Sequence, residues 1–197
     1  MNIKIVSDDE MRQLEETGFI GTYESTGVYE TRNDRIYFAK LRKEATIPSK
    51  ETENAGYDIR ACFDGDCIAI KPGEIELVPT GLCSAFSEDY VMVLKERGST
   101  GTKGLSQRCG IIDSGFRGEW FVPINNTTNK IIIITKYPED TQSMYGKGIV
   151  TIFPYTKSIC QALLLPVPKT EIIELTATEI KRVQSNRGSK CLGSSGK

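Results

Sequence analysis

The sequence predicts an all-β fold, a sandwich or barrel of short antiparallel strands. From Ile36 onward, short apolar runs alternate with turn chemistry such as Asp64-Gly65-Asp66 and Lys71-Pro72-Gly73. No βαβ spacing and no internal repeat interrupts this pattern. The length of 197 residues, with 39% hydrophobic and 26% charged residues, suits one ordinary domain that can bury a core.

The elements follow in chain order. Ser7 to Glu10 form a capping box that opens a short helix ending near Glu16, and residues 1–35 form an N-terminal appendage. The predicted strands are Ile36–Leu41, Tyr57–Ala61, Cys67–Ile70, Ile75–Val78, Tyr90–Lys95, Cys109–Ile112, Trp120–Ile124, Lys130–Thr135, Ile149–Phe153, Ile159–Leu165 and Thr170–Leu175. One more helical turn is expected near Ser99. Residues 36–185 form the β domain, and residues 186–197, mostly Gly, Ser and Lys, form a mobile C-terminal tail.

Composition argues against several classes of function. Lys and Arg number 25 and Asp and Glu 26, so the net charge of −1 provides no basic field for a nucleic acid. No apolar run approaches the ~20 residues of a membrane-spanning helix. Histidine is absent, which removes Ser-His and Cys-His nucleophiles and His-ligated metals. Six cysteines without CxxC spacing and a start without an apolar signal core predict a reduced, cytoplasmic protein, with Cys83, Cys109 and Cys160 in the core.

A Gly-rich segment, Glu96 to Gly104, follows a predicted strand directly. Glycines let backbone N–H groups turn inward, and Arg97 offers a planar fork that suits phosphate oxygens. The order of the Walker P-loop is absent, so an anion site and a plain Gly turn are both open interpretations.

A predicted hairpin, Gly110 to Glu119, places Asp113 at the end of an apolar strand. In a chain without histidine, this carboxylate is a candidate general base for water, although Asp before Ser-Gly is also a common turn former. Phe116 is either a core residue or a stacking face.

Two polar positions interrupt other strands. Asp58 and Arg60 either lie on a solvent face or belong to a site. Gln161, inside an otherwise apolar strand, is either a structural hydrogen-bond hub or a substrate contact, because a buried amide needs partners.

These segments and the Gly-rich tail resemble, in order and approximate spacing, the five sequence motifs of the trimeric dUTP pyrophosphatases (dUTPases). The resemblance covers roughly residues 36–197. The matching motifs are Ala55-Gly56-Tyr57-Asp58-Ile59, Arg97-Gly98-Ser99-Thr100-Gly101, Gly110-Ile111-Ile112-Asp113 with Phe116-Arg117-Gly118-Glu119, Ile159-Cys160-Gln161, and Arg187-Gly188 with Leu192-Gly193-Ser194-Ser195-Gly196.

The resemblance implies a β jelly roll in a homotrimer that hydrolyses dUTP to dUMP and pyrophosphate. Asp113 would activate the water that attacks the α-phosphate, and Phe116 would pack on the deoxyribose. Backbone groups of the hairpin would read uracil, at Gly110, Ile111, Ile112 and Asp113.

The resemblance also implies how the triphosphate is held. Arg97, Ser99 and Gln161 would hold the phosphates and the attacking water. Asp58 would orient waters bound to Mg²⁺, which the triphosphate carries in, so that no protein residue ligates the metal directly.

The C-terminal tail would close over the bound nucleotide. Arg187 would reach the γ-phosphate, and Leu192 would lie over the uracil. The glycines and serines of the tail, Gly193 and Ser194 among them, would supply N–H donors.

Five features depart from the family pattern. Gly98 stands where a phosphate-binding serine is usual, and Phe116 replaces a tyrosine. The segment between the second and third motifs is short, with Gln107 near the position of a usual asparagine. Thr156-Lys157-Ser158 replaces Gly-Asp-Arg, and Leu192 replaces a phenylalanine.

Two other functions stay open. The hairpin also resembles that of dCTP deaminase, but the position of that enzyme's proton-moving glutamate corresponds to Pro123 here, which cannot titrate. A dUTP-gated regulator would hold a protein partner through the N-terminal appendage or the 126–148 insertion.

Overall fold

The computed structural model describes residues 30–186 and 188–189, so the helix expected after Ser7 lies outside the described residues. The chain divides into two compact units, residues 1–167 and 168–197. The strands of the first unit are β1 (Ile36–Lys40), β2 (Gly56–Arg60), β3 (Cys67–Ile70), β4 (Ile75–Pro79), β5 (Leu82–Phe86), β6 (Tyr90–Lys95), β7 (Leu105–Gln107), β8 (Ile111–Ile112), β9 (Phe121–Asn126), β10 (Ile131–Thr135), β11 (Val150–Pro154) and β12 (Ser158–Pro166). Its helices are α2 (Gly98–Gly101) and α3 (Pro138–Tyr145).

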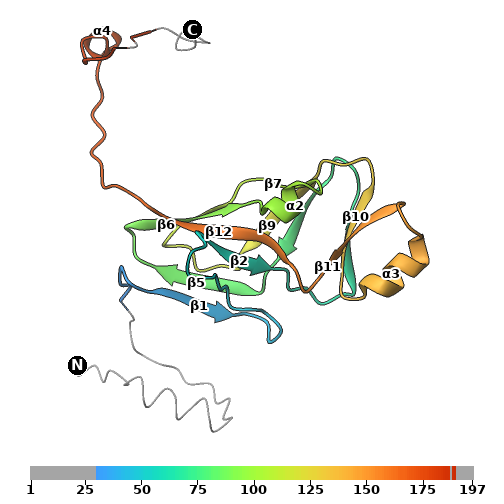
Figure 1. Cartoon of the computed structure of the whole chain (residues 1–197). Helices are drawn as coiled ribbons and strands as arrows, with labels where there is room; N and C mark the ends of the chain where they lie inside the picture. Colours follow the sequence, from blue (N-terminus) through green and yellow to red (C-terminus); the bar gives the residue numbers. More distant parts are fainter. Residues whose placement is uncertain (1–29, 187, 190–197) are drawn as a thin grey trace, which may run out of the picture. The chain divides into compact units, whose positions relative to one another are not determined.

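The strands form four small sheets in the jelly-roll manner. Their orders are β1-β5, β11-β10-β3, β2-β12-β6-β8 and β4-β9-β7 (Figure 1). The sheet that concerns function is the third, in which β12 lies between β2 and β6. The all-β prediction is confirmed.

One pair departs from the antiparallel prediction. Strands β10 and β11 run parallel, with Ile131 opposite Val150 and Thr135 opposite Pro154. Parallel neighbours need a crossover connection rather than a tight turn. Here the connection includes α3, which begins with Pro138 at its first turn and carries Glu139 and Asp140 there.

Three elements of the first unit are missing from the sequence prediction. Strand β5, LCSAF, carries small residues of low strand propensity, although its alternate positions are buried. Strand β7 is only three residues long and follows a Gly-rich turn. Helix α3 has no buried residue, so no apolar stripe marks it in the sequence.

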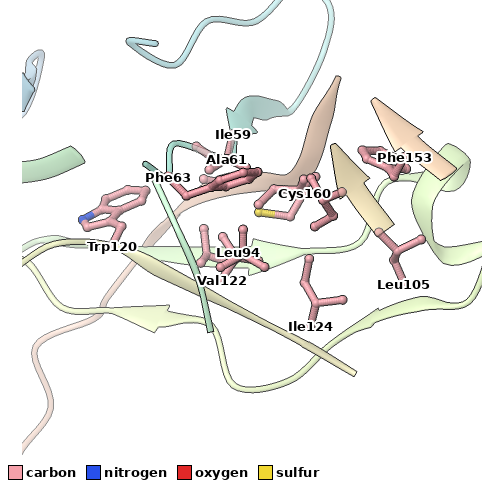
Figure 2. Packing of buried hydrophobic residues seen from close by; sticks show 14 of the residues in the cluster. Ile59, Ala61, Phe63, Leu94, Leu105, Trp120, Val122, Ile124, Phe153 and Cys160 are labelled. Atoms are coloured by element: carbon pink, nitrogen blue, oxygen red, sulfur yellow. The ribbon is translucent and has the colours of Figure 1, made fainter. Parts of the chain in front are cut away.

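The core lies between the sheets and is dominated by aromatic and branched aliphatic side chains. Figure 2 shows Trp120, Leu94, Val122, Ile59 and Cys160 within it. Trp120 is fully buried, and Phe38 meets its ring edge-on at 5.4 Å between centroids.

The cysteine prediction is correct for one residue of three. Burial raises the pKa of the Cys160 thiol, which therefore stays protonated in the core. Cys83 is only half-buried and Cys109 is exposed, so neither is a core residue. Cys109 has a φ of 55° and stands at a turn rather than in a strand, since β8 begins two residues later.

The second unit contains α4 (Ala177–Ile180), which a capping box between Thr176 and Glu179 opens. The strand predicted at Thr170–Leu175 is absent: this segment has no regular structure, and Ile172 is 96% exposed. An apolar run becomes a strand only when a neighbouring strand satisfies its backbone. None of the described helices is long and apolar enough to cross a membrane.

Candidate active site

Strand register brings the first predicted site residues together. On β12, Gln161 lies opposite Asp58 of β2 and also opposite Lys95 of β6. Directly opposed residues in a sheet point to the same face. Asp58 and Gln161 therefore project side by side, close to the Gly-rich turn that follows β6.

Arg97 makes a two-point ion pair with Asp58. Its Nε lies 3.0 Å from one carboxylate oxygen, and its Nη2 donates to the other at 3.4 Å. Its Nη1 donates to the carbonyl of Ser158 at 3.4 Å. All three guanidinium nitrogens are thus engaged by the protein, and the pair fixes the orientation of the Asp58 carboxylate.

The turn after Arg97 is the predicted helical turn, α2. Thr100, fully buried, accepts a hydrogen bond from the Arg97 N–H at 3.0 Å and donates one to the Arg97 carbonyl at 3.0 Å. Ser99 is left exposed at the tip of the turn. A Cβ on Gly98 would meet no atom within 4 Å, so the turn has room for a side chain there.

Gln161 is a structural hydrogen-bond hub, one of the two roles considered for it. Its amide donates to the Glu96 carbonyl at 2.8 Å, which links β12 to the end of β6. A Cβ on Gly56 would lie 2.5 Å from the Gln161 side-chain oxygen, so only glycine leaves room for this amide. Gln161 is therefore a hydrogen-bond hub that also lines a cavity.

Glu96 stabilises the place where β2, β12 and the turn after β6 meet, which we call the corner. Its carboxylate accepts a hydrogen bond from the backbone N–H of Gln107 at 2.9 Å. The hydrogen bond from its own backbone N–H, followed by that from Gln107, lowers the pKa of Glu96 below its usual value. The carboxylate stays ionised at neutral pH and ties the end of β6 to β7.

Two adjoining cavities open over this corner, and Asp58, Arg97 and Ser99 line both. One, of about 290 Å³, is lined in addition by Asn54, Ala55, Gly56, Gly98 and Gln161. The other, of about 360 Å³, is lined in addition by Arg60, Lys103, Phe153, Thr156, Lys157 and Ser158. The second cavity carries most of the positive charge.

The predicted hairpin lies apart from both cavities, since none of its residues lines either one. Strand β8 pairs with β6 through Ile112 opposite Met92. The hairpin then turns at Asp113, whose carbonyl accepts from the Phe116 N–H at 3.0 Å. Asp113 is exposed, and Phe116 is 43% exposed with its ring folded over Gly118.

The hairpin is stiffened at both ends. Gly110 has a φ of 124°, and a Cβ there would lie 2.8 Å from the Leu94 carbonyl, so glycine is required. The Arg117 guanidinium donates to the carbonyls of Ser84, Ser114 and Phe116. Asp113 and Ile111 are thus exposed on a segment of fixed conformation.

A single chain therefore holds the predicted site residues in two groups. Asp58, Arg97, Gly98, Ser99 and Gln161 surround the cavities. The second group, on or beside the hairpin, comprises Gly110, Ile111, Ile112, Asp113 and Phe116, with Gln107 next to Gly110. The tail residues Arg187, Leu192, Gly193 and Ser194 lie outside the described residues.

Sequence analysis gave no role to the cationic lining residues Lys103 and Lys157, and it left Arg60 open between a solvent face and a site. Lys103 lies inside the Gly-rich segment, and Lys157 lies inside the triplet that departs from the family pattern. Arg60 follows Asp58 by two residues on β2, and this spacing places both on one face of the strand. This strand period is the signal that favours a site over a separate solvent face for Arg60.

Comparison with known proteins gives a consistent result. The dUTPase family model matches residues 43–139. The deoxyuridine 5'-triphosphate nucleotidohydrolase of Leptospira interrogans is 36% identical over 104 residues, covering 51% of this chain and 71% of that protein. The protein of the same name from Nautilia profundicola is 31% identical over 167 residues, covering 83% of this chain and 99% of that protein.

Solved structures agree on the fold. The dUTPase of Staphylococcus bacteriophage 80alpha with dUpNHpp has a TM-score of 0.64 at 22% identity, over 83% of this chain and 99% of that one. A dUTPase from phage phi11 of S. aureus, described with a structural Mg(II) ion, has a TM-score of 0.56 at 18% identity. Together with the sequence relatives, these likenesses lead to one conclusion: the chain belongs to the dUTPase family.

Proposed function

We propose that the protein hydrolyses dUTP to dUMP and pyrophosphate. The observation that carries the proposal is the corner at which Asp58, Arg97, Ser99 and Gln161 meet over two adjoining cavities. Two relatives that match 51% and 83% of this chain are named for the same reaction. An exposed corner of cations, a hydroxyl and an amide suits a polyphosphate better than an apolar ligand.

Each of the predicted site residues has its own role in this proposal. Asp113 is the general base that takes a proton from the attacking water, because its carboxylate is exposed at a stiffened turn and the chain has no histidine. Gln161 and Ser99 position the water and the phosphates. Phe116 offers its exposed ring to the deoxyribose.

The hairpin backbone recognises the base. Gly110, Ile111 and Ile112 form a short edge that is held in place by the pairing of β8 with β6. Backbone donors and acceptors there can pair with the polar edge of uracil. The tail, with Arg187, Leu192, Gly193 and Ser194, closes over the bound nucleotide and excludes water.

The complete site needs more than one chain. The hairpin lines neither cavity, so we infer that a neighbouring copy in a homotrimer brings its hairpin to this corner. An apolar face on β4 and β9 supports assembly: Ile75, Leu77 and Phe121 are 55%, 56% and 42% exposed in the single chain. Register places them on one face, with Leu77 opposite Pro123 and Pro79 opposite Phe121.

The residues present fit a Mg²⁺ ion that arrives with the triphosphate. Within the described residues, no group of three or more Cys, Asp or Glu side chains could hold a metal by itself, and Asp58 is the one carboxylate that lines the cavities. Mg²⁺ prefers phosphate oxygens, retained waters and one or two carboxylates. Bound in this way, it would neutralise phosphate charge, while Asp58, oriented by Arg97, would accept hydrogen bonds from its waters.

One assay tests the proposal. Each deoxynucleoside triphosphate is incubated with the protein and Mg²⁺, and pyrophosphate and ammonia are both measured. We expect pyrophosphate from dUTP and ammonia from none of the nucleotides. Ammonia release from dCTP would instead indicate a deaminase, for which Pro123 supplies no titratable group.

A regulatory role through a protein partner is a second candidate. The connection around α3 exposes Tyr137, Met144, Tyr145 and Ile149, residue types that are frequent in protein interfaces. The study of the 80alpha phage enzyme describes phage dUTPases as controlling the transfer of virulence genes. For this chain, the 126–148 insertion and the N-terminal appendage are the segments proposed for such a partner.

A further inference from the structure

The larger of the two cavities has an excess of positive charge. Arg60, Arg97, Lys103 and Lys157 line it, against one carboxylate, that of Asp58. Arg97 and Asp58 neutralise each other in their ion pair. Three cations therefore remain, and within the described part of the chain none of them has a carboxylate at ion-pair distance.

A backbone hydrogen bond and strand pairing fix the main-chain positions of two of these cationic residues. Lys157 ends the turn between β11 and β12, where its N–H donates to the Pro154 carbonyl at 3.0 Å. The next residue, Ser158, lies opposite Arg60 on β2, just before an irregularity in the β12 register. Bulges of this kind commonly aim side chains beside binding sites.

Arg60 has a buried donor that the protein itself does not satisfy. Its Nε atom is buried and has no hydrogen-bond partner among the described residues. Buried polar atoms are almost always paired, so an unpaired guanidinium donor beside a cavity needs an explanation. Like charges that share a cavity are also unfavourable unless an anion joins them.

The Arg97 guanidinium already binds other groups of the protein. Its guanidinium donates to Asp58 and to the Ser158 carbonyl, which leaves two of its five N–H groups for a phosphate, and Asp58 offsets its charge. Further positive charge for a phosphate chain would come from other side chains. Arg60, Lys103 and Lys157 supply it in the adjoining cavity.

We propose that Lys157, with Arg60 and Lys103, binds the terminal phosphate of the nucleoside triphosphate and makes the site selective for triphosphates over diphosphates. This inference rests on the proposed function. Gln161 lines only one cavity and Lys157 only the other, while Ser99 lines both. A triphosphate whose reacting phosphate lies at Gln161 therefore extends past Ser99 to the three cations.

The test compares Lys157→Met with Lys147→Met, an exposed lysine that lines neither cavity. Calorimetry would give the Kd of each full-length protein for dUpNHpp, dUDP and dUMP with Mg²⁺. A hydrogen bond to a charged group is worth a factor of about 10 to 100 in affinity. Lys157→Met should weaken the binding of dUpNHpp by that factor and leave the binding of dUDP and dUMP nearly unchanged. Lys147→Met should change the binding of none of the three.

Two further variants test whether the loss of affinity comes from removing a positive charge in this cavity. Lys157→Arg should retain most of the affinity for dUpNHpp, and Lys103→Met should show the same triphosphate-selective loss as Lys157→Met. An equal loss for dUpNHpp and dUMP, or no loss in either Met variant, would overturn the inference.

A base-free probe separates this inference from the proposed function. Inorganic tripolyphosphate should bind the wild-type protein and bind Lys157→Met about 10 to 100 times more weakly. If wild type fails to hydrolyse dUTP but tripolyphosphate shows this loss, the proposed function is wrong and the cation site stands. If wild type hydrolyses dUTP and Lys157→Met binds dUpNHpp and tripolyphosphate as tightly as wild type does, only the cation site is wrong.

Discussion

Gly56 and Gln161 show how closely this site is fitted at the scale of single residues. The amide of Gln161 reaches the Glu96 carbonyl because Gly56, on the neighbouring strand, has no side chain in the way. A methyl group at residue 56 would press on both the Cβ and the amide of Gln161. The position of the Gln161 side chain therefore depends on the absence of a side chain at residue 56.

Gly56→Ala should therefore lower kcat by roughly 100-fold, the cost of a misplacement of about 1 Å at a reacting centre. Crowding should also reduce stability by about 1–3 kcal/mol. Steady-state hydrolysis of dUTP and denaturant unfolding measure the two effects. Gly65→Ala is the matched control, because a Cβ on Gly65 meets nothing within 4 Å; equal activity in both variants would contradict the role of Gly56.

Asp113→Asn should preserve the fold and nucleotide binding but lower kcat by about 10² to 10⁴, the usual value of general-base assistance. Asn keeps the shape and the turn-forming ability of the residue, and the side chain is exposed, so little stability should be lost. The measurement is kcat for dUTP beside the Kd for dUpNHpp. Near-normal turnover would remove Asp113 from its proposed role.

Sequence reasoning worked well where a residue's own chemistry was the signal. Asp58, Arg97 and Gln161 stand out in their segments, and the structure places them together. It gave no role to Lys157 and left Arg60 undecided, because a lysine in a turn and an arginine in a strand are by pattern ordinary surface residues. Only the meeting of β2 and β12 puts the two at one cavity.

At the scale of elements, the connection through α3 is the feature with a measurable consequence. It allows β10 and β11 to pair in parallel, yet α3 buries no side chain of its own. Among the described residues, its side-chain hydrogen bond to the sheet is that of 3.1 Å between Thr141 and Thr135. The length of the connection therefore matters more than its helical structure.

Replacing Pro138–Tyr145 by a Gly-Ser linker of equal length should leave kcat/KM for dUTP within about twofold. The melting temperature should fall by about 2–4 °C for each kcal/mol of lost contact. Thermal melts and hydrolysis assays measure these effects. A large loss of hydrolysis without a change in melting temperature would instead place α3 in the catalytic machinery.

The elements that sequence analysis missed share a physical cause. Strand β5 and helix α3 lack the apolar periodicity that marks an element, and only their neighbours stabilise them. The segment Thr170–Leu175 is the opposite case, with apolar residues but no partner strand among the described residues. The well-predicted strands β3 and β6 carry apolar residues of high strand propensity.

At the scale of the whole molecule, the separation of the two groups of site residues leads to a mixing experiment. Neither Asp113→Asn nor a chain truncated before Arg187 should hydrolyse dUTP at an appreciable rate. Mixed under conditions that allow subunit exchange, the two should regain activity, because some sites then combine an intact hairpin with an intact tail. Pyrophosphate release before and after exchange measures the effect.

Light scattering supplies the control for this experiment. The wild-type mass should be about three times the 21.9 kDa of one chain. A fully active monomer would contradict both the trimer and the shared site. A trimer in which the exchanged mixture stays inactive would keep the assembly and reject the sharing.

The chain carries one tryptophan, and its position gives the protein an internal optical reporter. Trp120 is fully buried and touches the ring of Phe38, so its fluorescence senses the core and the attachment of β1. Emission should lie toward the blue in the native protein and move to the red only when this packing opens. Because the Trp120 side chain is fully buried, a bound nucleotide should not touch its ring, and intrinsic fluorescence can follow unfolding in the presence of substrate.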